Sequence, residues 1–155
     1  MPTVTDMKTE IDDLKHEVKR HKLFTNWVQA MVDYFRRESN PKPSYDYVRG
    51  QVILVDFGFN VGNEFGGNHY AVVLLDSPAR NPKVVVLPLT SQKPKKKYTH
   101  HIEIDPIPGV PRDHWANSYE VRSVDKLRTQ PKTHRVSGST LDRISDAIVK
   151  TLALR

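Results

Sequence analysis

The stretch that decides the fold is "YVRGQVILVDFGFNVGNEFGGNHYAVVLLDSP", residues 47–78. It holds two runs of apolar, largely β-branched residues, 51–57 and 70–76, separated by a segment rich in glycine. Such runs are typical of strands, and their nearly continuous apolar character indicates burial on both faces. The stretch therefore predicts two buried strands joined by a loop that ends at His69, at the start of the second strand.

Three further runs of the same kind follow, at 83–89, 98–104 and 118–124, each bounded by Gly, Pro, Asn or Asp. Pro88 interrupts the first of them, and because proline has no N–H to donate, it indicates an edge strand or a bulge. With the first two runs they predict five or so strands in a small, strongly curved sheet. We therefore expect an α+β fold that is mainly β.

Helices are predicted at both ends of the chain. Leu141, Ile144, Ile148 and Leu152 recur at helical spacing and predict a C-terminal helix, for which Ser139 with Asp142 forms a suitable N-cap arrangement. Residues 3–40 contain neither Pro nor Gly, and a heptad stripe predicts one long helix over about 5–38. The stripe is imperfect because two of its nine positions are polar, and it consists of Met7, Ile11, Leu14, Val18, His21, Thr25, Val28, Val32 and Phe35. We expect 1–40 to be a helical extension for dimerisation or docking, 41–48 a linker, and 49–155 the main domain.

Composition excludes several classes of protein. The 155 residues include no cysteine, so a disulfide framework or thiolate metal site is impossible, and the seven histidines lack metal-ligand spacing. No apolar run approaches the roughly 18 residues of a membrane span. We expect a soluble, cytoplasmic protein without membrane contact, metal or cofactor.

The positive charge is concentrated in the main domain. Residues 1–40 hold seven basic and seven acidic side chains, so the net charge of +6 belongs to the rest. Residues 77–102 carry six Lys or Arg and no acid, including Lys95, Lys96 and Lys97. This run is either a solvated loop or a patch that steers phosphate groups.

Four blocks in succession resemble the motifs of the MazF/PemK family of toxin ribonucleases: residues 47–78, "VVVLPLTSQ" (84–92), "YTHHIEI" (98–104) and "SYEVRSVDKLR" (118–128). The resemblance runs from about Tyr47 to Arg155. It implies a barrel-like sheet of the SH3-like, plasmid-toxin type, a homodimer encoded by a bacterium, phage or plasmid, and inhibition by a cognate acidic antitoxin. It also implies metal-independent cleavage of single-stranded RNA, in which the ribose 2′-hydroxyl attacks the adjacent phosphate to leave a 2′,3′-cyclic phosphate and a 5′-hydroxyl.

The resemblance also assigns catalytic residues. Family members typically end the first loop with GG-x-R-P, and the arginine is catalytic; here "GGNHY" carries His69 in its place and Tyr70 in place of the proline. Losing a permanently charged arginine removes a phosphate clamp, whereas histidine, with an ordinary pKa of about 6.5, is the better acid and base near neutrality. Thr90 matches the family's strand-end threonine, whose hydroxyl can hydrogen-bond a phosphate oxygen in the transition state.

Further residues are candidates for RNA binding, either from their place in the family's loops and late motif or from their charge: Glu64, Asn68, Ser91, Gln92, Lys95, Lys96, Lys97, Glu120 and Arg122. For Arg122 two partners are open, an RNA phosphate or a carboxylate such as that of Asp125.

Two other functions stay open beside the endoribonuclease. The fold can be kept as a catalytically inactive module that binds RNA or protein, or the chain can be a dimeric interaction protein that acts through its N-terminal helix. An enzyme yields cleaved RNA, a binding module only salt-sensitive RNA affinity, and an interaction protein neither.

Overall fold

The computed structural model describes residues 3–14, 21–39 and 44–154, and the chain divides into two units, Met1–Asn40 and Pro41–Arg155. The first unit contains α1 (Val4–Leu14) and α2 (His21–Glu38). The predicted single helix over 5–38 is thus seen as two helices, and residues 15–20, through which the prediction runs, lie outside the described residues. In the part of the chain that the structure describes, no helix combines the length and apolar character needed to cross a membrane.

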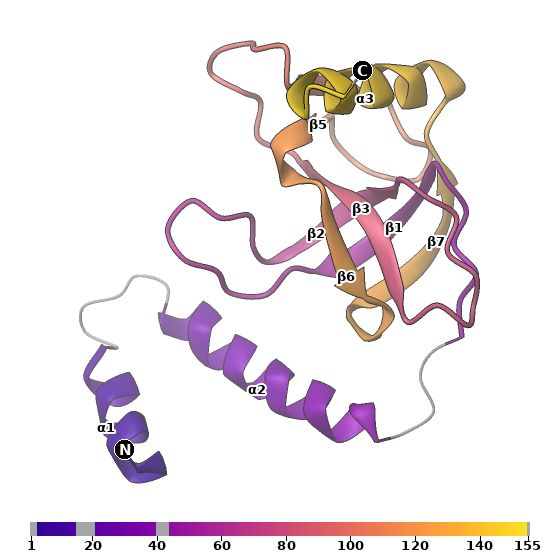
Figure 1. Cartoon of the computed structure of the whole chain (residues 1–155). Helices are drawn as coiled ribbons and strands as arrows, with labels where there is room; N and C mark the ends of the chain where they lie inside the picture. Colours follow the sequence, from indigo (N-terminus) through magenta and orange to yellow (C-terminus); the bar gives the residue numbers. More distant parts are fainter. Residues whose placement is uncertain (1–2, 15–20, 40–43, 155) are drawn as a thin grey trace. The chain divides into compact units, whose positions relative to one another are not determined.

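The described residues of the second unit form an antiparallel sheet and an α-helix, α3 (Gly138–Thr151) (Figure 1). Its strands are β1 (Gln51–Asp56), β2 (Asn68–Val73), β3 (Lys83–Thr90), β4 (His101–Ile104), β5 (His114–Asn117), β6 (Arg122–Asp125) and β7 (Thr129–Arg135). Their order in the sheet is β4-β5-β3-β2-β1-β7, and β6 pairs with β3 off this path. The predicted α+β fold, mainly β with a C-terminal helix, is confirmed.

Alternate residues of the strands belong to two separate hydrophobic cores. Val52 of β1 belongs to a cluster with Val72 and Leu87, whereas its neighbour Ile53 belongs to a second cluster with Val73. The first cluster is closed by Ile144 and Ala147 of α3, which lies across one side of the sheet in Figure 1. This explains the continuous apolar runs, because successive side chains point to opposite faces that are both buried.

Several local predictions were wrong. Residues Ser118–Glu120 form a 3₁₀ turn, η1, so only the end of the predicted 118–124 strand exists, and β5 and β7 were not predicted. The N-cap of α3 is Ser137, whose side chain accepts the N–H of Thr140, two residues before the predicted Ser139.

Pro88 lies in a central strand, not at an edge. Residues 83–86 of β3 pair with β6, whereas Leu89 and Thr90 pair with β5. Pro88 lies between the segment of β3 that pairs with β6 and the segment that pairs with β5. Its missing N–H therefore breaks neither ladder and costs little.

Candidate functional site

The loop between β1 and β2 is closed by backbone hydrogen bonds. The N–H of Phe57 donates to the carbonyl of Gly67 at 2.9 Å, and the N–H of Gly67 donates to the carbonyl of Gly58 at 2.7 Å. A Cβ on Gly66 would lie 2.7 Å from the Gly58 oxygen, and Gly67 has a φ of +85°. Glycine is therefore required at both positions, and the closed loop fixes the start of β2.

His69 leaves this loop as the second residue of β2. Ala71 pairs with Pro88, and continuing the same register by two residues puts His69 opposite Thr90. The half-buried imidazole has its Nδ1 atom 3.1 Å from the carbonyl oxygen of Leu89, and its ring centre is 4.5 Å from that of Phe65. The strand pairing thus brings the two predicted catalytic residues, His69 and Thr90, to neighbouring positions.

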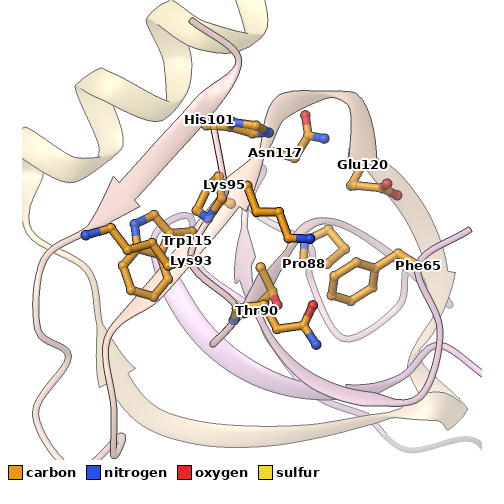
Figure 2. Close-up of a pocket in the computed structure, with 12 residues that line it drawn as sticks. Phe65, Pro88, Thr90, Lys93, Lys95, His101, Trp115, Asn117 and Glu120 are labelled. Atoms are coloured by element: carbon orange, nitrogen blue, oxygen red, sulfur yellow. Dashed lines mark hydrogen bonds between the residues drawn. The ribbon is translucent and has the colours of Figure 1, made fainter. Parts of the chain in front are cut away.

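A pocket of about 390 Å³ opens beside Thr90 (Figure 2). Its polar and charged lining comprises Thr90, Gln92, Lys93, Lys95, His101, Asn117 and Glu120. Its apolar lining comprises Phe65, Pro88, Pro94, Trp115 and Ala116. The pocket combines cationic, hydroxyl, imidazole and aromatic groups, which suits a ligand that carries both phosphates and bases.

Of the residues predicted from the sequence, four line the pocket: Thr90, Gln92, Lys95 and Glu120. His69 does not line it, but its ring packs on Phe65, which does. Glu64, Asn68 and Ser91 are exposed outside it.

The lysine run is divided among three environments. Lys95 lines the pocket, and Lys97 lines a smaller adjoining cavity of about 180 Å³ that shares Lys93, His101 and Trp115 with it. Lys96 is exposed and lines neither cavity, while its backbone carbonyl lies 3.1 Å from Nδ1 of His101.

Arg122 is bound by the protein rather than free for phosphate. Its guanidinium lies 2.5 Å from the Glu120 carboxylate and donates to the carbonyl of Phe65 at 3.2 Å. It also lies over the ring of Phe57, 5.5 Å from its centre. The carboxylate partner of Arg122 is thus Glu120 and not Asp125. Glu120 and Phe65 both line the pocket, so Arg122 links two residues of the pocket lining.

Sequence reasoning missed several pocket residues, among them Lys93, His101, Trp115 and Asn117. His101 pairs with Asn117, and Glu103 pairs with Trp115, across β4 and β5. Because β5 was not predicted, the ladder that brings these side chains together was not predicted either. The available signal was Trp115, one of only two tryptophans in the chain.

Two histidines near the site have a lowered pKa. Burial lowers the pKa of His114, against the opposing effect of its hydrogen bond to the Arg112 carbonyl. Loss of hydration and the neighbouring His101 imidazole lower the pKa of His100. Both rings are therefore neutral at neutral pH. Among the described residues, no three His, Asp or Glu side chains gather as metal ligands would.

Fold and pocket together define a class: a small antiparallel sheet with a C-terminal helix and a pocket lined by lysine, imidazole and aromatic groups. Residues 48–152 match the family described as PemK-like, MazF-like toxin of type II toxin-antitoxin system. "Endoribonuclease EndoA" of Bacillus subtilis (strain 168) is 30% identical over 109 residues, which are 68% of this chain and 94% of EndoA. The chain belongs to the MazF/PemK family of toxin endoribonucleases.

Solved structures agree on the fold. MazF from Deinococcus radiodurans superposes with a TM-score of 0.59 at 22% identity, covering 71% of this chain and 99% of that one. An endoribonuclease from Mycobacterial species, solved in complex with its cognate antitoxin, superposes with a TM-score of 0.56 at 21% identity, covering 70% and 97%. The resemblance inferred from the four sequence blocks is confirmed.

Proposed function

We propose that this chain cleaves single-stranded RNA in the pocket beside Thr90, without a metal, by the 2′-hydroxyl route. The 2′-oxygen forms a bond to phosphorus while the bond from phosphorus to the 5′-oxygen breaks, giving a 2′,3′-cyclic phosphate and a 5′-hydroxyl. A base must accept the 2′-hydroxyl proton, an acid must protonate the leaving oxygen, and donors must stabilise the phosphate oxygens. The observation that carries the proposal is the meeting of imidazole, hydroxyl and lysine groups at one cavity.

The imidazoles of His69 and His101 supply the proton transfers. Each has its Nδ1 atom 3.1 Å from a backbone carbonyl, that of Leu89 for His69 and that of Lys96 for His101. A carbonyl oxygen can only accept, so both Nδ1 atoms carry a proton and donate. In the neutral ring, Nε2 therefore carries the lone pair that can accept a proton from the RNA, and the hydrogen bond at Nδ1 fixes the tautomer.

The remaining chemistry is electrostatic. The Oγ1 atom of Thr90 accepts the N–H of Gln92 at 3.1 Å, which leaves the hydroxyl proton of Thr90 to donate to a phosphate oxygen. Lys93 and Lys95 line the same pocket and offset the charge of the phosphate. The ring of Trp115 offers a face on which a base can stack.

The test of this function compares three histidine variants of the full chain. Losing a general acid or base typically costs about a hundredfold or more in rate, so His69→Ala and His101→Ala should each slow cleavage by that factor. His134→Ala removes a histidine whose ring lies beside Gly109, whereas that of His69 packs on the pocket residue Phe65, and this variant should cleave as the parent does. Unchanged cleavage by both His69→Ala and His101→Ala would remove acid–base catalysis from the account.

His69→Arg restores the residue found in the resembling family. It should retain part of the activity, because arginine binds the phosphate through fixed charge. Arginine keeps its proton near neutral pH, so the variant can still bind the phosphate but cannot exchange a proton with the RNA as an imidazole can. A variant as inactive as His69→Ala would mean that this chain has rebuilt its site around histidine alone.

We further propose that the chain works in the cytoplasm as a homodimer that an acidic antitoxin inhibits. The excess of positive charge in the main domain and the mycobacterial relative solved with its antitoxin support the antitoxin. The heptad stripe supports dimerisation through α2, where Val28 and Val32 are 38% and 39% exposed. The double variant Val28→Lys, Val32→Lys should have half the molar mass of the parent by light scattering. The control Leu23→Lys, which lies on α2 but off the stripe, should keep the parental mass. An unchanged mass of the double variant would exclude the stripe as the dimer contact.

A further inference from the structure

Three aromatic side chains outside the pocket form a continuous stack: Tyr98, His100 and Tyr119. The rings of Tyr98 and His100 are 5.3 Å apart with an interplanar angle of 7°, and those of His100 and Tyr119 are 4.4 Å apart at 18°. Tyr98 is 52% exposed and Tyr119 is 65% exposed. The outer face of Tyr119 therefore ends the stack toward solvent.

The backbone that carries these rings is fixed by hydrogen bonds. The carbonyl of His100 accepts the N–H of Ser118 at 2.9 Å, and the N–H of Tyr119 donates to the side chain of Asn117 at 3.1 Å. The buried Ser118 is bonded in turn to Thr151 at the end of α3. These bonds tie the backbone at His100 to η1, the 3₁₀ turn that carries Tyr119, and tie η1 to α3; the three stacked rings are called the platform below.

The platform adjoins the cleavage pocket through shared residues. His101 lines the pocket, and its ring centre lies 4.4 Å from that of His100 and 5.6 Å from that of Tyr98. On the other side, Asn117 and Glu120 line the pocket and flank Tyr119 in the chain.

We propose that the outer face of Tyr119 is a second nucleotide subsite, where a base of the cleaved RNA strand stacks beyond the pocket. This rests on the proposed function, because the occupant is the continuation of the strand held at Thr90. A flat, exposed ring next to the pocket suits a base, since every base offers a π face and stacking needs no particular sequence. The lysines at 95–97, which directly precede Tyr98, supply the charge that holds the adjoining phosphates.

The experiment uses the full chain and an RNA whose cleavage point has been mapped. Two uncleavable probes carry a 2′-deoxyribose at this point: a short one that fills only the pocket, and one extended by three nucleotides on either side. The parent should bind the extended probe more tightly. Tyr119→Leu should lose about 5-fold to 150-fold in affinity for the extended probe, as expected for one stacked base, and almost nothing for the short probe.

Two controls separate stacking from other effects. Tyr119→Phe keeps the ring and should bind both probes within about twofold of the parent. The slope of log affinity against log salt should be the same for Tyr119→Leu and the parent, because no phosphate contact is lost. A 2-aminopurine base, placed in turn at each added position, should be quenched by the parent at one position and not by Tyr119→Leu.

Three results would overturn the subsite: equal affinity of Tyr119→Leu and the parent for the extended probe, an equal loss on both probes, or a lower molar mass of Tyr119→Leu by light scattering. The last would mean that the platform contacts a second copy of the chain. If the parent cleaves no RNA, the short and extended probes are built instead on an RNA that it binds; a preference for the extended probe that Tyr119→Leu loses would then keep the subsite while the proposed function fails.

Discussion

Replacing Arg122 by Gln separates a residue that holds the pocket from one that binds RNA. The substitution removes the ion pair with Glu120, the hydrogen bond to the Phe65 carbonyl and the contact with the Phe57 ring. The ion pair is partly exposed, at 30% and 24%, so solvent screening limits it to about 1 kcal/mol. A hydrogen bond of ~1 kcal/mol and a cation–π contact of ~0.5 kcal/mol bring the expected loss of stability to about 2–3 kcal/mol.

Cleavage should fall as well, because Glu120 and Phe65 line the pocket and lose the group that joins them. Misplacement of binding groups by about 1 Å can cost on the order of a hundredfold in rate, and we expect a loss of about 10-fold to 100-fold for Arg122→Gln. Urea unfolding measures the stability and a fluorogenic RNA measures the rate. The control is Arg143→Gln, which breaks a 2.7 Å ion pair with Asp105. The two side chains are 45% and 47% exposed, so the variant should lose less than about 1 kcal/mol of stability and cleave as the parent does.

The opposite result would identify Arg122 as a phosphate ligand. In that case Arg122→Gln would be as stable as the parent, and the slope of log affinity against log salt would flatten by about one unit. That pattern would contradict the assignment of its guanidinium to Glu120 and Phe65.

Three more predictions follow from the described contacts. Changing the lysines at 95–97 to Gln should flatten the salt dependence of RNA binding by up to about one unit per lost phosphate contact and leave urea unfolding nearly unaltered; an unchanged slope would make the run a solvated loop. In urea unfolding, Gly109→Ala should lose about 1–3 kcal/mol more stability than Gly62→Ala. Both glycines have a positive φ, but only at position 109 would a Cβ overlap the His134 ring. Equal losses of stability would contradict this packing. Burial lowers the pKa of His114, so below about pH 6.5 the unfolded chain binds more protons than the folded one. The stability that this neutral ring contributes above that pH is therefore lost as the pH falls. The loss of unfolding free energy between pH 7.5 and 5.0 should be smaller for His114→Gln than for the parent.

The strands that the sequence predicts well are those whose signal is local. β1, β2 and β3 are long apolar runs, and their burial on two faces follows from composition alone. β5 has four residues, too few for a period, and it exists because β3 and β4 pair with it on either side. β7 contains Pro131 and few apolar residues, and it is tolerated as a strand because it lies at the edge of the sheet.

The site divides in the same way. His69 and Thr90 stand in recognisable motifs, so the resemblance could single them out. The pairing of His101 with Asn117 is a tertiary fact that appears only when β4 and β5 lie side by side. Positive charge alone does not identify an RNA-binding residue, as Lys126 of the last motif shows. Its buried ammonium donates to the carbonyls of Tyr45, Ser77 and Pro78 at 2.8–3.1 Å and so stabilises the domain.

The chemistry of the pocket is tested most directly by the ends that it leaves on RNA. The full chain is incubated with a mixed RNA pool in EDTA, and the new termini are sequenced by methods specific for 5′-hydroxyl and 2′,3′-cyclic phosphate ends, with His69→Ala in parallel. We predict both kinds of end at matching positions from the parent, unaffected by EDTA, and on the order of a hundredfold fewer from His69→Ala. New 5′-phosphate ends, cleavage abolished by EDTA, or no new ends at all would contradict cleavage through the 2′-hydroxyl.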